Sequence, residues 1–499
     1  MPTRPRWRVA VGRWHSPVMA RLRSQVAFHA GIVAAIAIGT LPALPAERPG
    51  EGFALAYAAG ARDAAGRFMG GTEARNLVAY RGRLYAGIGY WEDRPGGEGR
   101  QGAAILVLDG PAAAWRVEHV FDETLPPGTV GGRKRDFAIS ALLGVNFATD
   151  GSGAPLPVPV SLLLASSWDL TGATRIFSRD EATGAWSATT LAADRPAPDF
   201  LPQIRSLAAH RDRSTGGDRV FAGNDPRGIF AGSYDPTLPG GIRWDAVPEL
   251  DISAISTAGF RGLAGRLRVS SFAECDGVLY AAVGQQIYRR EDGAAPRWRL
   301  VYTNPDPGHS ETGLRGLTAI ANPSGAGRGS SKEVLLAAVE GDAARIVRVD
   351  PASGAETTEL DLRAFLADAW GERVGYVIAA YNDMTKSGDL LLIGVHAFIP
   401  LRAPIAPGHA VVDVGYGRVE SGGWYLVRHA DGRYALRRIA LPAPDDGRAL
   451  VAVRTIAASP FPGDAGAFYF AGYDANKAPA HDTAWIARAG AKAALGDRQ

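Results

Sequence analysis

The stretch from residue 75 to residue 93 decides the fold, and it reads Arg75-Asn-Leu-Val-Ala-Tyr80, Arg81-Gly82, Arg83-Leu-Tyr-Ala-Gly-Ile-Gly-Tyr90, Trp91-Glu92-Asp93. Two runs rich in aliphatic and aromatic residues, separated by Arg-Gly, predict two strands joined by a tight turn. Glycine readily adopts the positive φ that such a turn requires. The stretch therefore predicts a strand, a two-residue turn, a second strand and an acidic end.

Variants of the first strand recur along almost the whole chain. Each copy opens on a residue that is often arginine, has an aliphatic residue or phenylalanine two positions later, and then a small residue. A spacing of 45 to 78 residues between copies suits four short strands with their loops, which is typical of a propeller. The copies open at Arg75, Phe137, Arg205, Ser270, Arg315, Tyr376 and Arg454.

A second and more apolar run follows each copy, at residues 84–87, 162–165, 220–223, 279–282, 335–338, 391–394 and 469–472. Runs that are apolar on both faces suit sheets packed between two neighbours. Small residues near their inner edge would let the sheets converge. We therefore expect an all-β chain in which residues 47–490 form a seven-bladed β-propeller of four-stranded blades, with a C-terminal tail over 491–499.

The last unit lacks a good fourth strand after residue 487, while two short runs near the start, 53–57 and 66–70, belong to no unit. We expect one of them to complete the last blade and close the ring, which would leave no open sheet edge. A helix is expected over residues 362–370, with Asp361 as its N-cap.

The first 46 residues differ in composition from the rest. They hold six arginines and no acidic residue, and an apolar run spans 26–41. This pattern predicts an export signal, with an N-terminal membrane anchor as the alternative, and so a periplasmic or secreted protein. Leaving the six arginines out turns 54 basic against 51 acidic residues into a small acidic excess, which argues against nucleic-acid binding.

The sequence offers little for metals or cofactors. Cys275 is the only cysteine, so no internal disulfide or cysteine-based metal site is expected, and its strand pattern predicts a small buried side chain. No histidine pair has metal-ligand spacing on one element. We expect no metal, no cofactor, no further transmembrane segment and a monomer.

The outer hairpins carry an aspartate, usually a glycine and often a tryptophan. The best copy runs from Ser178 and Asp180 to Trp186, and weaker copies include Asp109 with Trp115. This resembles the Asp-box turn of sialidase-like and other secreted bacterial propellers. The resemblance implies that the aspartate caps the turn and the tryptophan packs between sheets, and it carries over no activity.

The inner strands open on the rim to which the second strands return. One mouth of the predicted channel should therefore carry Arg75, Arg205, Arg315 and Arg454, surrounded by polar and aromatic ends of the returning strands. The surrounding residues are Trp91, Asp93, Trp168, Asp169, Asp225, Asp342, His396 and Asp474. A Pro- and Gly-rich insert over 397–423 leaves from the same rim and is placed to act as a lid.

Two interpretations of the arginines stay open. Guanidinium groups bind carboxylate or phosphate in bidentate fashion, which predicts an anion site. Alternatively, each arginine pairs with an acid of an adjacent blade and locks the ring. We expect a non-catalytic protein that binds an anionic small molecule, a glycan or a partner protein.

The alternative is a sialidase-like glycoside hydrolase acting on an acidic sugar, because that family places three arginines on the sugar carboxylate. Hydrolysis by ordinary glycosidases needs two carboxyls about 5–9.5 Å apart. The early Arg-Ile-Pro of that family is missing, and the nearest match, Ile399-Pro400-Leu401-Arg402, comes late and in scrambled order. Binding is therefore favoured over hydrolysis.

Overall fold

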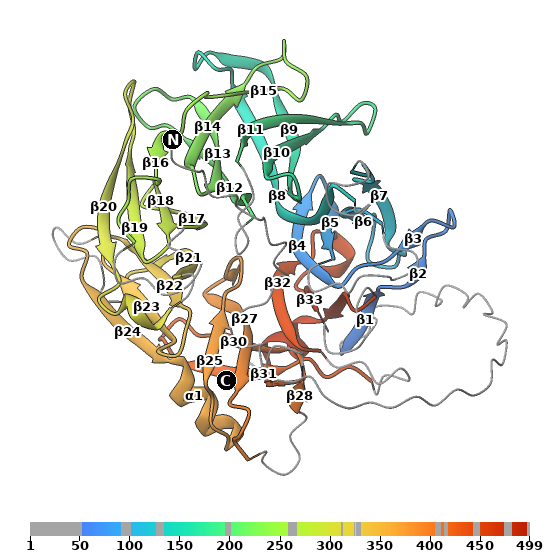
Figure 1. Cartoon of the computed structure of the whole chain (residues 1–499), viewed down its shortest axis with the longest axis vertical. Helices are drawn as coiled ribbons and strands as arrows, with labels where there is room; N and C mark the ends of the chain where they lie inside the picture. The colour runs from blue at the N-terminus through green and yellow to red at the C-terminus, as the bar shows by residue number, and fades with distance from the viewer. Residues whose placement is uncertain are drawn as a thin grey trace, which may run out of the picture.

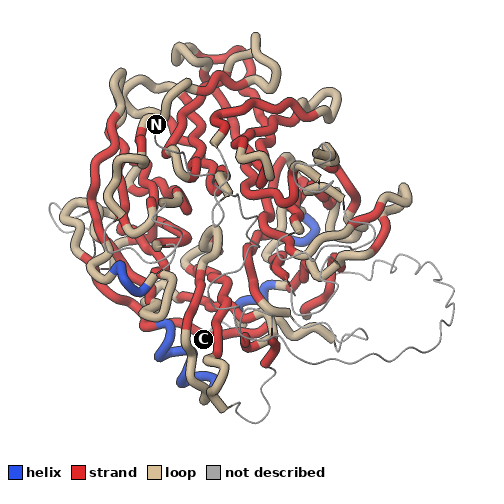
Figure 2. Tube along the Cα trace, in the orientation of Figure 1, coloured by secondary structure: helices blue, strands red, loops and turns tan. Residues whose placement is uncertain are grey.

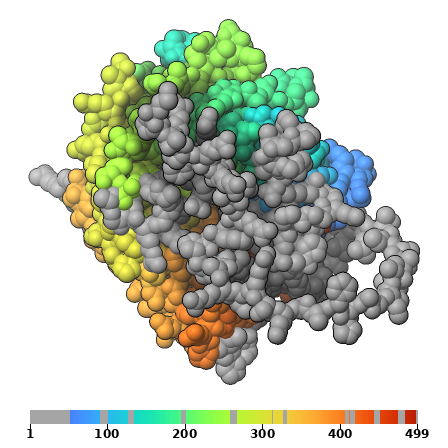
Figure 3. Space-filling model, viewed as in Figure 1, coloured from blue at the N-terminus to red at the C-terminus, as the bar shows by residue number. Residues whose placement is uncertain are grey.

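Antiparallel strands make up most of the described protein, with little helix, and they are arranged around a common centre (Figures 1 and 2). The computed structural model describes residues 52–90, 101–125, 134–194, 201–257, 267–310, 313–323, 325, 331–404, 411–413, 418–442, 450–473 and 482–496. Around the edge of the face seen in the space-filling view, the colour advances from blue through green and yellow to orange, so consecutive parts of the chain are neighbours (Figure 3).

The strands form antiparallel runs in chain order. The first two runs are β4 (Glu73–Tyr80), β5 (Arg83–Gly89), β6 (Ala104–Leu108) and β7 (Arg116–Val120), then β8 (Asp136–Thr149), β9 (Pro155–Asp169), β10 (Ala173–Arg179) and β11 (Trp186–Ala193). The next run is β12 (Gln203–Arg211), β13 (Asp218–Asp225), β14 (Gly228–Tyr234) and β15 (Ile242–Trp244), and β16 (Leu250–Asp251) also pairs with β14.

The second half of the chain repeats the arrangement. Two four-stranded sheets are β17 (Val269–Cys275), β18 (Val278–Val283), β19 (Gln286–Glu291) and β20 (Arg297–Thr303), then β21 (Leu314–Ala321), β22 (Glu333–Val339), β23 (Arg345–Val349) and β24 (Glu356–Asp361). Then come β25 (Tyr376–Ala379), β26 (Thr385–Ser387), β27 (Leu390–Ile399), β28 (Val411–Asp413), β29 (Arg418–Glu420), β30 (Trp424–Arg428) and β31 (Tyr434–Arg438).

The two ends of the chain meet in one sheet. Strands β32 (Ala452–Ala458), β33 (Phe468–Tyr473) and β34 (Trp485–Ala489) are followed by β1 (Phe53–Ala58), which pairs antiparallel with β34. The 53–57 run, and not the 66–70 run, is therefore the partner of the last strand. The latter contributes β3 (Phe68–Met69), which forms a hairpin with β2 (Ala61–Arg62).

The innermost strands contact one another in chain order. β4 contacts β8, β8 contacts β12, β12 contacts β17, and β17 contacts β21. At the other end of the chain, β32 contacts both β27 and β4. Figure 1 shows β4, β12, β17, β21 and β32 nearest the centre. Five of the seven predicted inner runs therefore lie close to the middle of an all-β molecule, in an arrangement compatible with a β-propeller-like fold. They are the runs that open at Arg75, Arg205, Ser270, Arg315 and Arg454.

Apolar side chains fill the space between consecutive sheets. Phe221 and Ile229 of one sheet pack with Leu279 and Ala281 of the next in a single buried cluster. Since each middle strand has a neighbour on both sides, both of its faces are apolar, as the sequence predicts. The close approach of these two sheets also requires a glycine at position 223, because an added Cβ would lie 2.6 Å from a Val269 methyl group.

Local sequence signals are confirmed where they depend on backbone chemistry. Arg81 and Gly82 have φ values of 48° and 73°, and Asp276-Gly277 repeats the turn. Helix α1 (Leu362–Trp370) has the predicted bounds, and the Asp361 side chain accepts a hydrogen bond from the Ala364 N–H. Cys275 is buried, as predicted.

The outer turn at Asp180 has the predicted capping chemistry. The Asp180 carboxylate accepts hydrogen bonds from the Thr183 N–H and hydroxyl at 2.7 and 2.8 Å. Trp186 lies beside Phe121 of the preceding sheet, with ring centres 6.1 Å apart. At this copy the aspartate caps a turn and the tryptophan packs between sheets.

Two regions differ from the sequence-based expectation. The inner strand expected from Tyr376 is interrupted: β25 and β26 flank residues 380–384, and Ala380 has a φ of 50°. The insert over 397–423 is not all loop, because β27 continues to Ile399 and pairs with β29. Helix α2 (Ala491–Leu495) packs against the last sheets, and its Ala494 carbonyl accepts a hydrogen bond from Tyr425.

Candidate functional site

β-Bulges set the direction of the predicted arginines. In the pairings of β4 with β5, β12 with β13 and β32 with β33, the register skips Arg75, Arg205 and Arg454 respectively. A bulged residue has no partner across the ladder, and the bulge re-aims its side chain. All three side chains are nevertheless almost fully buried. The bulges therefore direct guanidinium groups into the interior between the inner strands.

Arg75 and Arg454 share one carboxylate. One carboxylate oxygen of Glu73 accepts a hydrogen bond from Nη1 of Arg75 at 3.2 Å, and the other oxygen lies 2.9 Å from Nη2 of Arg454. The Arg75 guanidinium also lies 4.6 Å from the ring centre of Trp168, a cation–π geometry. Glu73 thus joins the first inner strand to the last.

Arg315 is held by a carboxylate of its own sheet. Its Nε donates to Glu340, whose other oxygen accepts the hydroxyl of Tyr376 at 2.5 Å. Its Nη1 donates to the main-chain carbonyl of Tyr381 at 3.1 Å. Arg315 is therefore engaged by protein groups on two sides.

The segment over residues 380–384, here called the central loop, crosses to the other arginines. The Tyr381 ring centre lies 3.5 Å from the Arg454 guanidinium carbon and 4.5 Å from that of Arg315. The Asn382 amide donates to the Arg75 carbonyl at 2.5 Å. One loop therefore contacts three arginine residues from three different strands.

Arg205 is the least satisfied of the predicted arginines. Among the described residues its one ion pair is with Asp225, at 3.6 Å from Nε, and this nitrogen is buried without a hydrogen-bond partner. Burial and the charge of Arg268 lower the pKa of Arg205 well below its ordinary value, against the opposing effect of Asp225. The charges of Arg315 and Arg75 also lower the pKa of Arg205. These guanidiniums therefore lie close enough to repel the guanidinium of Arg205.

Arg268 shares the same carboxylate. Its Nε lies 3.9 Å from Asp225 and also has no hydrogen-bond partner in the described structure. Asp225 is fully buried, and burial raises its pKa to about 6 although both arginines oppose this. Two guanidiniums thus face one carboxylate without a hydrogen bond from either.

The arginine cluster, defined as Arg75, Arg205, Arg268, Arg315 and Arg454, contacts three described carboxylates, those of Glu73, Asp225 and Glu340. Burying a charge without a counter-charge is costly. Among the described residues, Arg205 and Arg268 are thus the members of the cluster with the longest ion pairs.

The remaining predicted residues separate into three groups. Trp168 and Asp225 contact the arginine cluster, and His396 lies close enough for Arg454, together with burial, to lower its pKa to about 3. Asp169 and Asp342 do not contact the arginine cluster in the described structure: Asp169 pairs with Arg135 and Arg175, and Asp342 pairs with His309. Trp91, Asp93 and Asp474 lie outside the described residues.

The position of Asp169 and Asp342 at the mouth of the channel stays a prediction, although Asp169 pairs in register with Asp136 at the start of β8, as expected of a second strand that returns to the rim. Both follow second strands as predicted, but each carboxylate turns toward a cation on a neighbouring loop or strand. Asp169 also accepts hydrogen bonds from the N–H and hydroxyl of Thr171, which makes it a turn cap.

Three further residues, which the sequence pattern did not identify, contribute to the arginine cluster or contact it. Arg268 lies just before β17, two positions ahead of Ser270, which the register of that strand skips. Alternate residues of a strand share a face, and this spacing could have identified Arg268. Glu73 precedes Arg75 by the same two positions. Tyr381 carried no signal, because the break after β25 resembles an ordinary loop.

Within the described ranges, no group of three or more His, Cys, Asp and Glu side chains is arranged to hold a metal ion. In the same ranges, none of the helices has the length and apolar character needed to cross a membrane.

Comparisons with known proteins give structural likenesses at low identity. No protein-family model matches the sequence, and no curated protein matches it. The computationally designed Ika8 protein is 12% identical, with a TM-score of 0.36, over 84% of this chain and 96% of that chain. An ancestral GH74 enzyme is 11% identical, with a TM-score of 0.45, over 87% of this chain and 50% of that chain. Neither likeness assigns an activity to this protein.

Proposed function

We propose that this protein is an exported seven-bladed β-propeller, closed by β1, that binds a small anionic molecule or an anionic glycan at the arginine cluster and does not transform it. The run of antiparallel sheets around one centre and the pairing of β1 with β34 support the fold. The composition of residues 1–46 supports export, either by a cleaved signal or with a retained anchor.

One observation carries the binding proposal: the buried guanidiniums of Arg205 and Arg268 face the single carboxylate of Asp225 without hydrogen-bonding to it. A ligand carboxylate or phosphate would supply both the missing charge and the missing acceptors. Charge-assisted hydrogen bonds from arginine are short and strong, and they suit planar carboxylates and phosphates.

Binding is favoured over hydrolysis by the state of the acids. Glu73 and Glu340 are both buried and bonded to arginines of the cluster. Carboxylates used in this way stabilise the positive charge of the guanidiniums and are poorly suited to act as a nucleophile or proton donor. The described acids that contact the arginine cluster therefore act as its counter-ions, which favours binding over the sialidase-like alternative.

The test is a thermal-shift titration with glucuronate, glucose 6-phosphate and inorganic phosphate, with glucose as the neutral control. The variants are Arg205→Gln and, as a matched control on the same strand, Arg211→Gln, whose side chain is 62% exposed. We expect at least one anion to raise the melting temperature of the wild type and of Arg211→Gln. Its affinity for Arg205→Gln should fall at least about tenfold.

The same titration can contradict the proposal. If all three anions leave the wild type unchanged, or if Arg205→Gln responds as strongly as Arg211→Gln, then Arg205 does not contribute to an anion site.

A further inference from the structure

An arginine-lined pocket lies at the far end of the first inner strand from Arg75. It has a volume of about 500 Å³ and is lined by Arg81, Arg83, Tyr85, Arg179, Glu181 and Ala182. Arg75 opens β4, whereas Arg81 forms the turn after it, so six residues of extended chain place the pocket about 20 Å from the Arg75 backbone. The pocket is therefore distinct from the arginine cluster.

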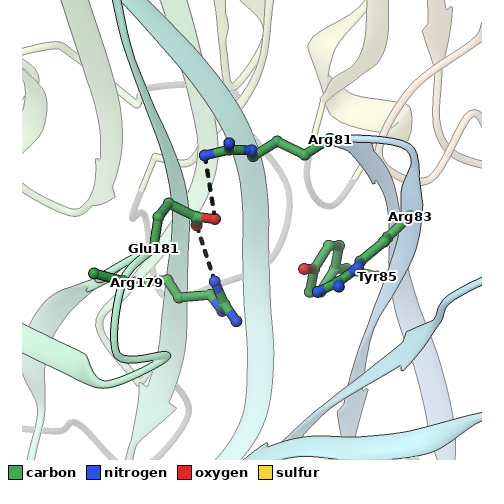
Figure 4. A pocket seen from close by; sticks show the side chains of 6 residues that line it. Arg81, Arg83, Tyr85, Arg179 and Glu181 are labelled. Carbon is green, nitrogen blue, oxygen red and sulfur yellow. Dashed lines mark ion pairs between the residues drawn. The ribbon is translucent and has the colours of Figure 1, made fainter.

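Two sheets contribute the walls. Arg83 and Tyr85 belong to β5, whereas Arg179 ends β10 and Glu181 lies in the turn that follows it. Figure 4 shows Arg83 and Tyr85 facing Arg179 and Glu181, with Arg81 reaching across from the turn. The Tyr85 side chain is almost completely buried. It forms a fixed part of the wall.

Glu181 joins two of the arginines. Its carboxylate lies 3.5 Å from Arg81 and 3.1 Å from Arg179 (Figure 4). The pair of Arg81 with Glu181 lies at the solvent boundary, because these side chains are 58% and 25% exposed, and such ion pairs contribute little to stability. The Arg179 side chain is only 10% exposed, but it keeps a second carboxylate partner in Glu118 at 2.6 Å. A ligand carboxylate or phosphate can therefore replace Glu181 at modest cost.

The charge around the pocket is unbalanced in the same direction as in the arginine cluster. Arg83 pairs with Asp109 at 3.1 Å, Arg116 pairs with Asp109 and Glu118, and Arg179 also pairs with Glu118. Together with the pairs of Glu181, four guanidiniums in this network meet three carboxylates. Arg83 keeps a side-chain exposure of 44%, so it can reach a ligand from the side opposite Glu181.

We propose that this pocket binds a small molecule with two anionic groups, such as a dicarboxylate or a sugar bisphosphate. One group would take the place of Glu181 between Arg81 and Arg179, and the other would meet Arg83. The volume lies within the ordinary range for small-molecule sites and exceeds what a single phosphate needs.

The test is calorimetric titration of the full chain with citrate at low ionic strength, in the Arg205→Gln background so that the arginine cluster does not contribute. Adding Arg81→Gln and Arg83→Gln should weaken citrate binding at least about tenfold. Both side chains are exposed, so these changes should leave the fold intact, which the melting temperature checks. Arg297→Gln, at a side chain 81% exposed on β20, is the matched control and should change nothing.

Glu181→Gln separates this proposal from a purely structural role. Because the carboxylate competes with the ligand for Arg81 and Arg179, removing its charge should strengthen citrate binding several-fold. The proposal is overturned if citrate does not bind in the Arg205→Gln background, or if its affinity is unaffected by the Arg81 and Arg83 changes. A Glu181→Gln variant that binds citrate more weakly would also overturn it.

Discussion

At the scale of single residues, the centre of the molecule holds more positive charge than the described acids balance. Glu73 forms ion pairs with Arg75 and Arg454. Asp225 is the shared counter-ion of Arg205 and Arg268, whose Nε atoms lie 3.6 and 3.9 Å from its carboxylate. Removing an arginine and removing an acid should therefore have opposite effects on stability.

Arg205→Met should stabilise the protein in the absence of ligand. The substitution removes a buried charge whose one described ion pair is loose, and it leaves Asp225 with Arg268. We expect the free energy of unfolding to rise by about 1–2 kcal/mol, measured by urea denaturation, while anion binding is lost. A clear fall in stability would mean that Arg205 serves mainly to lock the sheets.

Glu73→Gln should lower the stability of the protein. It leaves Arg75 buried without its carboxylate, so the free energy of unfolding should fall by about 3 kcal/mol. The anion-induced rise in melting temperature should be at least as large as in the wild type, because the excess positive charge grows. Glu291→Gln, which breaks exposed pairs with Arg297 and Arg299, should cost at most about 0.5 kcal/mol.

His396 should give the protein a measurable pH dependence. Burial and Arg454 lower its pKa to about 3 in the folded state, so between that value and the ordinary 6.5 the unfolded chain binds a proton that the folded chain does not. Stability contributed by His396 is therefore complete above pH 6.5 and is lost as the pH falls. Between pH 6 and 4, the difference in unfolding free energy between wild type and His396→Gln should shrink by about 1.4 kcal/mol per pH unit.

This difference isolates His396 from groups of opposite sign. The raised pKa of Asp225 acts the other way, because this carboxyl holds a proton in the folded state at pH values where the unfolded chain has lost it. A constant difference between the two proteins over this range would show that His396 is not held neutral.

At the scale of elements, what the sequence predicts depends on how local the cause is. Helix α1 follows from the Asp361 cap, and the Arg81-Gly82 turn follows from glycine's freedom at positive φ. The direction of Arg205 depends on a bulge against β13, which no local pattern announces. Tyr381 meets Arg315 and Arg454 only because a loop interrupts a strand.

The pairing of β1 with β34 gives a prediction for a whole strand. A chain that begins at residue 60 should have a lower melting temperature than one that begins at residue 47, because β34 would become an open edge and Phe470 would lose its contact with Phe53. We also expect self-association on size-exclusion chromatography. Adding a synthetic peptide of residues 50–59 should restore the melting temperature.

An unchanged melting temperature in the chain that begins at residue 60 would contradict the role given to β1. Failure of the peptide to restore the melting temperature of a destabilised chain would show that the pairing of β1 with β34 does not by itself account for the lost stability.

At the scale of the whole molecule, the arginine cluster exists because the sheets share one centre. Its five members come from five separate parts of the chain, at β4, β12, the start of β17, β21 and β32. The repeated sequence pattern predicts an all-β chain and brings four of the five to one place. It could not show which of them the acids neutralise, because that depends on distances across the centre.

The most direct measurement is the anomalous difference map of crystals grown with selenate, an anion with the geometry of sulfate. If the arginine cluster binds anions, a selenium peak should appear beside the guanidiniums of Arg205 and Arg268, with the selenate oxygens at about 3 Å from their nitrogens. Anion binding by the cluster is contradicted by a map with no peak at this place in which protein carboxylates accept hydrogen bonds from both guanidiniums.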